Sequence, residues 1–531
     1  MFSSFGISRL AFALFLLVNA NALIAQGVPV ATNPEVSVAN GAVSLPVHDM
    51  REGQAAGPKV ADPIRIVHPN GPVTSPNDPV VQTAPRVSAA SVTSGLNFEG
   101  LGDGFPNFTV NSAPPDTNGA VGATQVVEWV NESFEVFDKA TGNAVKGPIP
   151  GNQLFQALGA NHPCAVNNDG DPIAEYDKLN GRWVMTQFSV TNGAAQGFFQ
   201  CVAVSQTSDA TGAFNVYAFQ QPNFNDYSKL GVWPTGYFVT FNIFSGNTFV
   251  GPRICALDGA AMRAGASATQ QCFQLANTIG TVLPSDIDGT TAPPAGTDPY
   301  FAAFGANLLN VFRFHVDFAT PANSTLTGPI NTSVAAFSEA CSGGTCIPQP
   351  NTRQQLDSLG DRLMYRLAFR QFADGHQALV VNHSVTVSKT QPSGVRWYEL
   401  RPNVSTGGLS VFQQGTFAPA DGVSRWMGSV AQDKVGNMVA GFSASSSSTH
   451  PSIRFALRTA ADPAGTLGTE TSIFAGTGSQ LKNLNRWGDY TALSVDPADD
   501  CTFWYFNEYI ATSGTFNWHT RIASFKLSNC L

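Results

Sequence analysis

Five aspartates recur at one position of a repeated pattern, and their carboxylates are the first groups in this sequence that could do chemistry. Asp116, Asp171, Asp226, Asp361 and Asp489 each follow a Pro, Asn or Gly and precede a short apolar stretch. If the pattern is a structural repeat, these side chains occupy equivalent places around one axis. Carboxylates gathered in this way repel one another unless a cation or hydrogen-bond donors compensate. We therefore expect all five to contribute to a ligand-binding site.

Calcium is the cation that we expect at this site. It takes oxygen ligands in flexible numbers, and Asp171, Asp226 and Asp489 are the predicted metal ligands. A structural interpretation stands beside this one. An aspartate before a strand also accepts local backbone N–H bonds and shapes a turn, without binding any ligand.

Two arginines complete the predicted site. Arg425 and Arg486 each precede a tryptophan and lie just before the last two repeats. An arginine at such a loop end can hold a carboxylate, sulfate or phosphate group in a bidentate manner. Arg182 and Arg396 also precede a tryptophan but lie in the middle of expected strands, so packing is the alternative role for these pairs. No serine-nucleophile, zinc-protease or phosphate-loop motif is present, and we assign no catalytic residue.

The elements that must position these residues form a repeat. Asp116, Asp171 and Asp226 are spaced by 55 residues, and two weaker copies of the pattern occur near Asp286 and Met427. Each copy contains short apolar stretches that read as about four strands separated by turns. Seven such copies predict an all-β, seven-bladed propeller.

The chain divides into three parts. Residues 1–25 combine a basic residue, a short apolar run and small residues at a cleavage position, which predicts a signal peptide. Residues 26–94 are rich in proline and lack aromatic residues, which predicts a disordered spacer or pro-segment. The propeller should occupy residues 95–531. Its last repeat has about three strands, and we expect residues 96–101 to supply the fourth, so that the two ends of the chain close the ring.

Cysteine usage supports an oxidising compartment. The eight cysteines all lie beyond residue 160, and an even number in an exported chain favours disulfides. Their order predicts four local pairs: Cys164–Cys201, Cys255–Cys272, Cys341–Cys346 and Cys501–Cys530.

Composition limits the partners. The formal net charge is -9, and only 12% of residues are charged. Because a nucleic-acid surface needs clustered Lys and Arg, we expect no DNA or RNA partner. No stretch after the signal peptide is long and apolar enough to predict a membrane span. A secreted protein, extracellular or periplasmic, is the expected product.

Three stretches together resemble a known group of proteins. They are PPDTNGAVGATQVVEWVN (114–131), NNDGDPIAEYDKLNGRWVMTQF (167–188) and RWGDYTALSVDPADDCTFWYFNEY (486–509). These resemble a largely uncharacterised family of exported bacterial proteins that are thought to form propellers. The resemblance spans roughly residues 95–530. It implies fold and export, and it carries over no catalytic residue.

Three functions remain open at this stage. The first is recognition of an extracellular polysaccharide or surface glycan at the axial face. The second is a secreted polysaccharide hydrolase or lyase in which the aspartates act as acid and base and Arg425 or Arg486 neutralises an acidic sugar. The third is an adhesion or scaffold domain without a small ligand.

Overall fold

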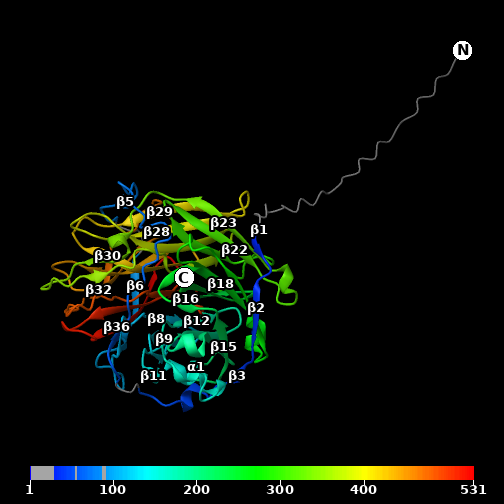
Figure 1. The fold of residues 1–531 in the computed structure, drawn as a ribbon. Helices are drawn as coiled ribbons and strands as arrows, with labels where there is room; N and C mark the ends of the chain where they lie inside the picture. Colours follow the sequence, from blue (N-terminus) through cyan, green and yellow to red (C-terminus); the bar gives the residue numbers. More distant parts are fainter. Residues whose placement is uncertain (2–28, 54–56, 87–90) are drawn as a thin grey trace.

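The computed structural model describes residue 1 and residues 29–53, 57–86 and 91–531. Its main body is a ring of antiparallel sheets (Figure 1), whose strand order divides into seven four-stranded sheets. Six of these sheets follow the chain order, the seventh takes its outer strand from the N-terminal side, and the fourth and fifth are joined at their inner strands. We call these sheets blades 1 to 7. The predicted all-β propeller is therefore confirmed, and the strand order is consistent with the predicted seven blades.

The blades have the following strands, given from the axis outward. Blade 1 contains β8 (Asn118–Val121), β9 (Gln125–Val130), β10 (Ser133–Asp138) and β11 (Ala144–Pro150); blade 2 contains β12 (Ile173–Asp177), β13 (Arg182–Ser189), β14 (Phe198–Ser205) and β15 (Phe214–Gln221). Blade 3 contains β16 (Phe224–Trp233), β17 (Gly236–Ser245), β18 (Thr248–Leu257) and β19 (Ala268–Gln274); blade 4 contains β20 (Leu283–Asp288), β21 (Tyr300–Gly305), β22 (Leu308–His315) and β23 (Thr325–Ser333). Blade 5 contains β26 (Met364–Gln371), β27 (Gln377–Val385), β28 (Gly394–Asn403) and β29 (Gly408–Phe417); blade 6 contains β30 (Ser424–Gln432), β31 (Met438–Ser445), β32 (Ser452–Arg458) and β33 (Thr471–Phe474). Blade 7 contains β34 (Ala492–Val495), β35 (Phe503–Ile510), β36 (Trp518–Leu527) and β6 (Val92–Gly102).

Short elements connect and decorate the blades. The helices are η1 (Val47–Asp49), η2 (Gly151–Leu158), α1 (Pro163–Val166), α2 (Gly193–Gln196), α3 (Gly259–Arg263), η3 (Pro321–Asn323) and η4 (Ala340–Gly343). Two small pairings lie outside the blades: β4 (Val60–Ala61) with β7 (Ser112–Ala113), and β24 (Thr345–Ile347) with β25 (Leu356–Asp357). Among the residues with assigned coordinates, no helix is long and apolar enough to cross a membrane.

The two ends of the chain close the ring. Strand β6, from the N-terminal side, pairs antiparallel with β36 and becomes the outer strand of blade 7. This confirms the predicted closure, which covers the outer edge of β36 that would otherwise be open for pairing with another chain. All four predicted disulfides are present, and Cys501–Cys530 links the turn between β34 and β35 to the residues that follow β36. Disulfides of this kind are typical of proteins that fold outside the cytoplasm.

The segment before the propeller differs from its prediction. Four short strands within residues 29–86 lie along the ring as added edge strands, where a disordered spacer was predicted. Strands β1 (Pro29–Thr32), β2 (Glu35–Ala39) and β3 (Ala42–Val43) extend blades 4, 3 and 2, visible as the blue trace at the outer edge in Figure 1. Strand β5 (Val81–Gln82) extends blade 5. The disorder prediction is therefore wrong for these residues, because backbone pairing with open blade edges orders a segment that has too little apolar surface to fold alone. Residues 2–28 lie outside the described residues, so the signal peptide stays a prediction.

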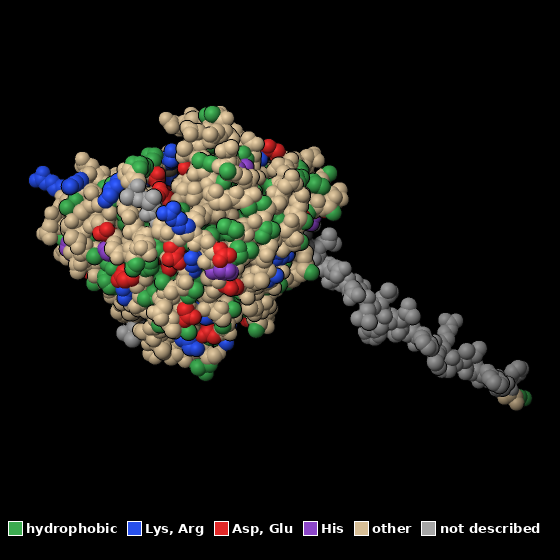
Figure 2. Space-filling view, turned by 90° about the horizontal axis from the view of Figure 1, so that it is seen from below, with side chains coloured by type: hydrophobic (Ala, Val, Ile, Leu, Met, Phe, Trp, Pro, Cys, Tyr) green, Lys and Arg blue, Asp and Glu red, His purple; other side chains and the backbone are tan. Residues whose placement is uncertain are grey.

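Buried aromatic side chains fill the spaces between blades. Trp426 and Trp487 are fully buried, and their ring centroids are 5.6 Å apart. Both tryptophans therefore serve packing, as the alternative interpretation proposed. On the face drawn in Figure 2, acidic and basic side chains are interspersed among hydrophobic and other groups.

Blades 4 and 5 meet at the axis in an unusual way. Strand β20 pairs with β21 only through Leu283 and Pro284, and then turns to pair in parallel with β26 of the next blade. This places Asp286 and Asp288 against Arg366 of β26, at 3.0 and 2.8 Å. The inner end of blade 4 thus becomes part of a buried ionic cluster on the axis.

Candidate functional site

Four of the five predicted aspartates converge at one end of the axis. Asp116, Asp171, Asp226 and Asp489 line a common cavity, which we call the axial mouth. Asp116 and Asp171 have φ angles of 49° and 48°, a left-handed conformation that aspartate tolerates better than most residues and that turns the chain into the innermost strand. The predicted convergence is therefore real, and a role in ligand binding stays a prediction.

The other two predicted residues lie elsewhere. Asp361 is bound by its neighbour Arg362 at 2.8 Å, and it is Arg362 that reaches the axial mouth. Arg425 begins β30, but its guanidinium contacts Asp421 and Glu470 at 2.6 and 2.7 Å. Its predicted place beside the axis is wrong, because those two carboxylates satisfy the guanidinium within blade 6.

Arg486 is placed as predicted, at the axial mouth. It donates to Asp489 and Asp357 at 2.5 and 2.8 Å. Asp357 comes from the β24–β25 hairpin, and burial raises its pKa to about 7, against the opposing effect of Arg486. The arginine therefore joins the hairpin to blade 7 as well as lining the mouth.

The axial mouth is strongly acidic and dry. Burial, together with the neighbouring Asp171, raises the pKa of Asp226 to about 7. Burial also raises the pKa of Asp116, with Asp489 adding to the effect, and raises that of Asp171. Just below them, the ammonium of Lys229 lies 3.5 Å from the ring centroid of Tyr227. The mouth therefore carries more carboxylates than it can keep charged at neutral pH.

The predicted calcium site does not form. Within the described ranges, no group of three or more His, Cys, Asp or Glu side chains is arranged to hold a metal ion. Protein donors occupy the three predicted ligands instead: Asp489 accepts from Arg486, Asp171 from the backbone N–H of Tyr227 at 2.9 Å, and Asp226 faces Arg65 at 3.7 Å. Cationic and N–H donors thus fill the positions that a cation would need.

An ionic column fills the axis below the mouth. Arg366 is fully buried and contacts Asp286, Asp288 and Glu175, the last at 3.8 Å. Burial raises the pKa of Glu175 to about 7, and Tyr365 donates to it at 2.5 Å. These groups form buried ion pairs, yet Asp286 Oδ2, both carboxylate oxygens of Asp288 and Arg366 Nε have no hydrogen-bond partner among the described residues.

The chain itself closes the axial mouth. Residues 60–67, which we call the strap, run across it, and Asp62, Pro63 and Arg65 line the cavity together with the aspartates. Only about 40 Å³ remains, far below the roughly 300–1,000 Å³ of a typical ligand pocket. A sugar therefore has no room at the predicted axial site while the strap is in place.

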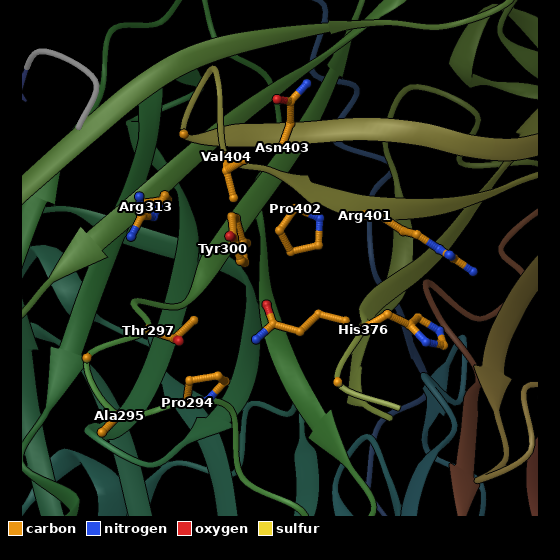
Figure 3. Close-up of a pocket in the computed structure, with 14 residues that line it drawn as sticks. Pro294, Ala295, Thr297, Tyr300, Arg313, His376, Arg401, Pro402, Asn403 and Val404 are labelled. Atoms are coloured by element: carbon orange, nitrogen blue, oxygen red, sulfur yellow. The ribbon is translucent and has the colours of Figure 1, made fainter. Parts of the chain in front are cut away.

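Open cavities lie at the other end of the blades. The axial mouth is formed where the innermost strands begin, whereas these cavities lie at the loops that follow them. The first has a volume of about 480 Å³ and lies between blades 4 and 5 (Figure 3). Tyr300 and Arg313 reach it from blade 4, and His376, Arg401 and Asn403 from blade 5. We call it the first lobe.

The lining of the first lobe has one sign of charge. It includes Arg313, Arg401 and His376, and no aspartate or glutamate is among the described residues that line it. Arg313 contacts Asp298 at 3.1 Å, yet its buried Nε has no hydrogen-bond partner among the described residues. A buried donor without a partner is costly, so this guanidinium retains binding capacity beside the cavity.

A second lobe of about 480 Å³ adjoins the first. His376 and Arg401 line both lobes, and Figure 3 shows the guanidinium of Arg401 pointing away from Arg313. Arg401 lies over the ring of Phe412 at 3.4 Å and contacts Glu399 at 2.8 Å, while the His376 ring is stacked on Phe372 at 4.2 Å. Aromatic rings thus hold both side chains of the shared wall. We call the two lobes together the groove.

Sequence reasoning did not find the groove, although two signals mark it. The loop after β20, residues 289–299, is rich in proline and glycine and forms one wall. The turn Asp374-Gly375-His376 forms another wall. Neither signal specifies that loops of neighbouring blades diverge enough to leave a cavity.

Comparisons with known proteins give no family. No family model and no curated protein matches this chain, so the resemblance to the exported family stays a prediction. Among solved structures, similar ones include a polysaccharide lyase, an ulvan lyase, with 11% identity, 80% of this chain and 97% of that chain covered, and a TM-score of 0.36. The N-terminal domain of Nup159 is 9% identical, with 89% of this chain and 100% of that chain covered and a TM-score of 0.35. An endo-arabinase from Bacteroides thetaiotaomicron is 8% identical, with 66% of this chain and 92% of that chain covered and a TM-score of 0.29.

Proposed function

We propose that this protein is an extracellular or periplasmic recognition protein for an acidic polysaccharide, which it binds in the groove. The observation that carries the proposal is the first lobe. It is open, it has the volume of a ligand site, and two arginines and a histidine line it without a carboxylate among the described lining residues. An acidic sugar would supply negative charge to a lining whose described residues include no carboxylate.

The groove offers what a sugar chain needs at successive positions. Arg313 can hold a carboxylate or sulfate at one end through charge-assisted hydrogen bonds, and Asn403 and Gln377 add donors and acceptors for hydroxyl groups. The stacked His376 and the aromatic ring of Phe412 provide apolar faces in and beside the shared wall. The second lobe contains both Arg458 and Asp462, so it suits a less acidic unit of the same polymer.

Three features support binding rather than cleavage. The carboxylates predicted to act as acid and base lie under the strap, away from the groove. The acidic residues of the second lobe include Glu399, which is bound to Arg401, and Asp374, which is bound to His376 at 2.5 Å. Among the described residues that line the groove, Asp374 and Glu399 are therefore engaged by cationic partners, whereas hydrolysis requires two carboxylates that flank a glycosidic bond.

The test is affinity gel electrophoresis with polysaccharides cast in the gel. Polyuronate and sulfated glycan should retard the wild-type protein, and a neutral glucan should not. Retardation should fall as salt is raised, because the interaction is ionic. Equal retardation by neutral and acidic polymers would contradict the proposal, as would the absence of any retardation. Incubation with the same polymers should release no new reducing ends; release would replace binding with cleavage as the function.

A further inference from the structure

The strap crosses the axial mouth as an extended peptide. It begins with β4, which pairs in parallel with β7 of the main body, and the N–H of Asp62 continues the pairing by donating to Ala113 O at 2.9 Å. It ends where the N–H of Val67 donates to the carboxylate of Asp361 at 2.5 Å. Between these two points, the strap passes directly over the four aspartates.

Two arginines of the body hold the strap by its backbone. Arg486 Nε donates to the carbonyl of Asp62 at 2.8 Å, and Arg362 Nη2 donates to the carbonyl of Arg65 at 2.6 Å. Both arginines are almost fully buried and are fixed by carboxylates of the body. Backbone contacts of this kind recognise an extended peptide whatever its side chains are.

One side chain of the strap supplies specificity. The guanidinium of Arg65 lies 3.7 Å from Asp226 and 4.6 Å from the ring centroid of Phe224. A carboxylate and an aromatic face together form a site for a cationic side chain. The arginine is thus held by its charge and by its flat face.

The charge of the mouth explains why the occupant is cationic. Without the strap, the cavity would be lined by four carboxylates, Asp116, Asp171, Asp226 and Asp489, and by two guanidiniums, Arg362 and Arg486. Such a site has two more carboxylates than guanidiniums, so a cationic group lowers the repulsion among the carboxylates. In the structure, the strap supplies the guanidinium of Arg65 to this cavity, together with the carboxylate of Asp62, whose pKa burial raises to about 6.

We infer that the axial mouth is a peptide-binding site, that the strap is its internal ligand, and that an extended, arginine-containing segment of a partner protein binds there when the strap leaves. This site is separate from the groove, so the inference does not depend on the proposed function. Its partner is recognised by two backbone carbonyls three residues apart and by the arginine that carries the second of them.

The test uses the full chain with the strap loosened. A recognition sequence for a site-specific protease is inserted between Asn70 and Gly71, both exposed, and Arg65→Ala is introduced in the same chain. The probe is a fluorescein-labelled peptide with the sequence of residues 58–70, and binding is followed by fluorescence anisotropy. Far-ultraviolet circular dichroism before and after cleavage verifies that the blades stay folded.

The cleaved variant should bind the wild-type peptide at least about tenfold more tightly than the uncleaved wild-type chain does, because the internal ligand has been weakened. A peptide with Arg65→Ala should lose about tenfold in affinity. The matched control is a peptide with Lys59→Ala, which loses the same charge but whose lysine contacts Phe516 at 5.5 Å, outside the mouth. It should bind like the wild-type peptide.

Two results would overturn the inference. One is a folded, cleaved variant that does not bind the wild-type peptide, which would make the strap a fixed structural element. The other is equal weakening by the two alanine substitutions, which would show that only net charge matters. As a second route, Asp226→Asn in the cleaved chain should reduce binding of the wild-type peptide but leave the Arg65→Ala peptide unaffected.

Discussion

Replacing Arg366 with methionine tests the ionic column on the axis. The guanidinium is fully buried and contacts Asp288, Asp286 and Glu175 at 2.8, 3.0 and 3.8 Å. Methionine fills much of the same volume but leaves buried carboxylates without their main cation. Removing one partner of a buried ion pair costs about 3–5 kcal/mol. We expect the free energy of unfolding to fall by an amount within this range, although Arg366 contacts three carboxylates. The loss should not be larger because Lys178 remains 3.5 Å from Asp288.

The loss should depend on pH. Glu175 has a folded-state pKa of about 7, above its ordinary value of 4.5, because it is buried. Its favourable contribution is therefore complete below pH 4.5 and disappears as the pH rises through 7. Without Arg366, the pKa of Glu175 rises further, which adds about 1.4 kcal/mol of destabilisation at high pH for each pKa unit. The variant should thus lose more stability at pH 8 than at pH 5.

The assay is urea unfolding followed by tryptophan fluorescence at both pH values. Urea is uncharged and does not screen the ion pairs. The control is Arg366→Lys, which keeps the charge and should show a smaller loss with weaker pH dependence. An equal loss at pH 5 and pH 8 in Arg366→Met would refute the electrostatic reasoning, because it would show that packing alone accounts for the effect.

Three further predictions concern the groove, the carboxylates and the crosslinks. Arg313→Gln should weaken polyuronate binding by roughly 10–100-fold in affinity electrophoresis, because it removes a charge-assisted hydrogen bond. The control is Arg353→Gln on the exposed surface, which should bind polyuronate like the wild-type protein. An equal effect of the two substitutions would refute the assignment of Arg313 to the binding site. Because Asp226 has a pKa of about 7 when folded, the urea midpoint of the wild-type protein should rise between pH 8 and pH 6, and a fall would contradict the raised pKa. Replacing Cys501 and Cys530 with alanine removes a crosslink between residues 29 positions apart and should lower the free energy of unfolding by about 3–4 kcal/mol. If the free energy of unfolding does not change measurably, this disulfide has no role in stability.

The sequence was a good guide to features that repeat or pair locally. A constant interval between Asp116, Asp171 and Asp226 predicted the blades. In the first two blades the aspartate turns the chain into the inner strand with the same left-handed conformation. The four disulfides were predictable because each links cysteines that are neighbours along the chain. Closure by residues 96–101 followed from the missing strand of the last repeat.

Features that depend on side-chain direction or on distant contacts were not predictable in this way. Arg425 and Arg486 have the same local sequence context, yet one contacts Glu470 within its own blade and the other the axial Asp489. The strap has no apolar pattern, because blade edges and body arginines hold it through its backbone. The groove arises between loops of different blades, whose separation no local signal encodes.

A crystal structure of the protein with an acidic trisaccharide tests the central proposal most directly. We predict ordered sugar in the groove, with a carboxylate or sulfate within hydrogen-bond distance of Arg313 and a ring beside His376. Sugar bound at any other face at saturating concentration, with the groove empty, would contradict the account.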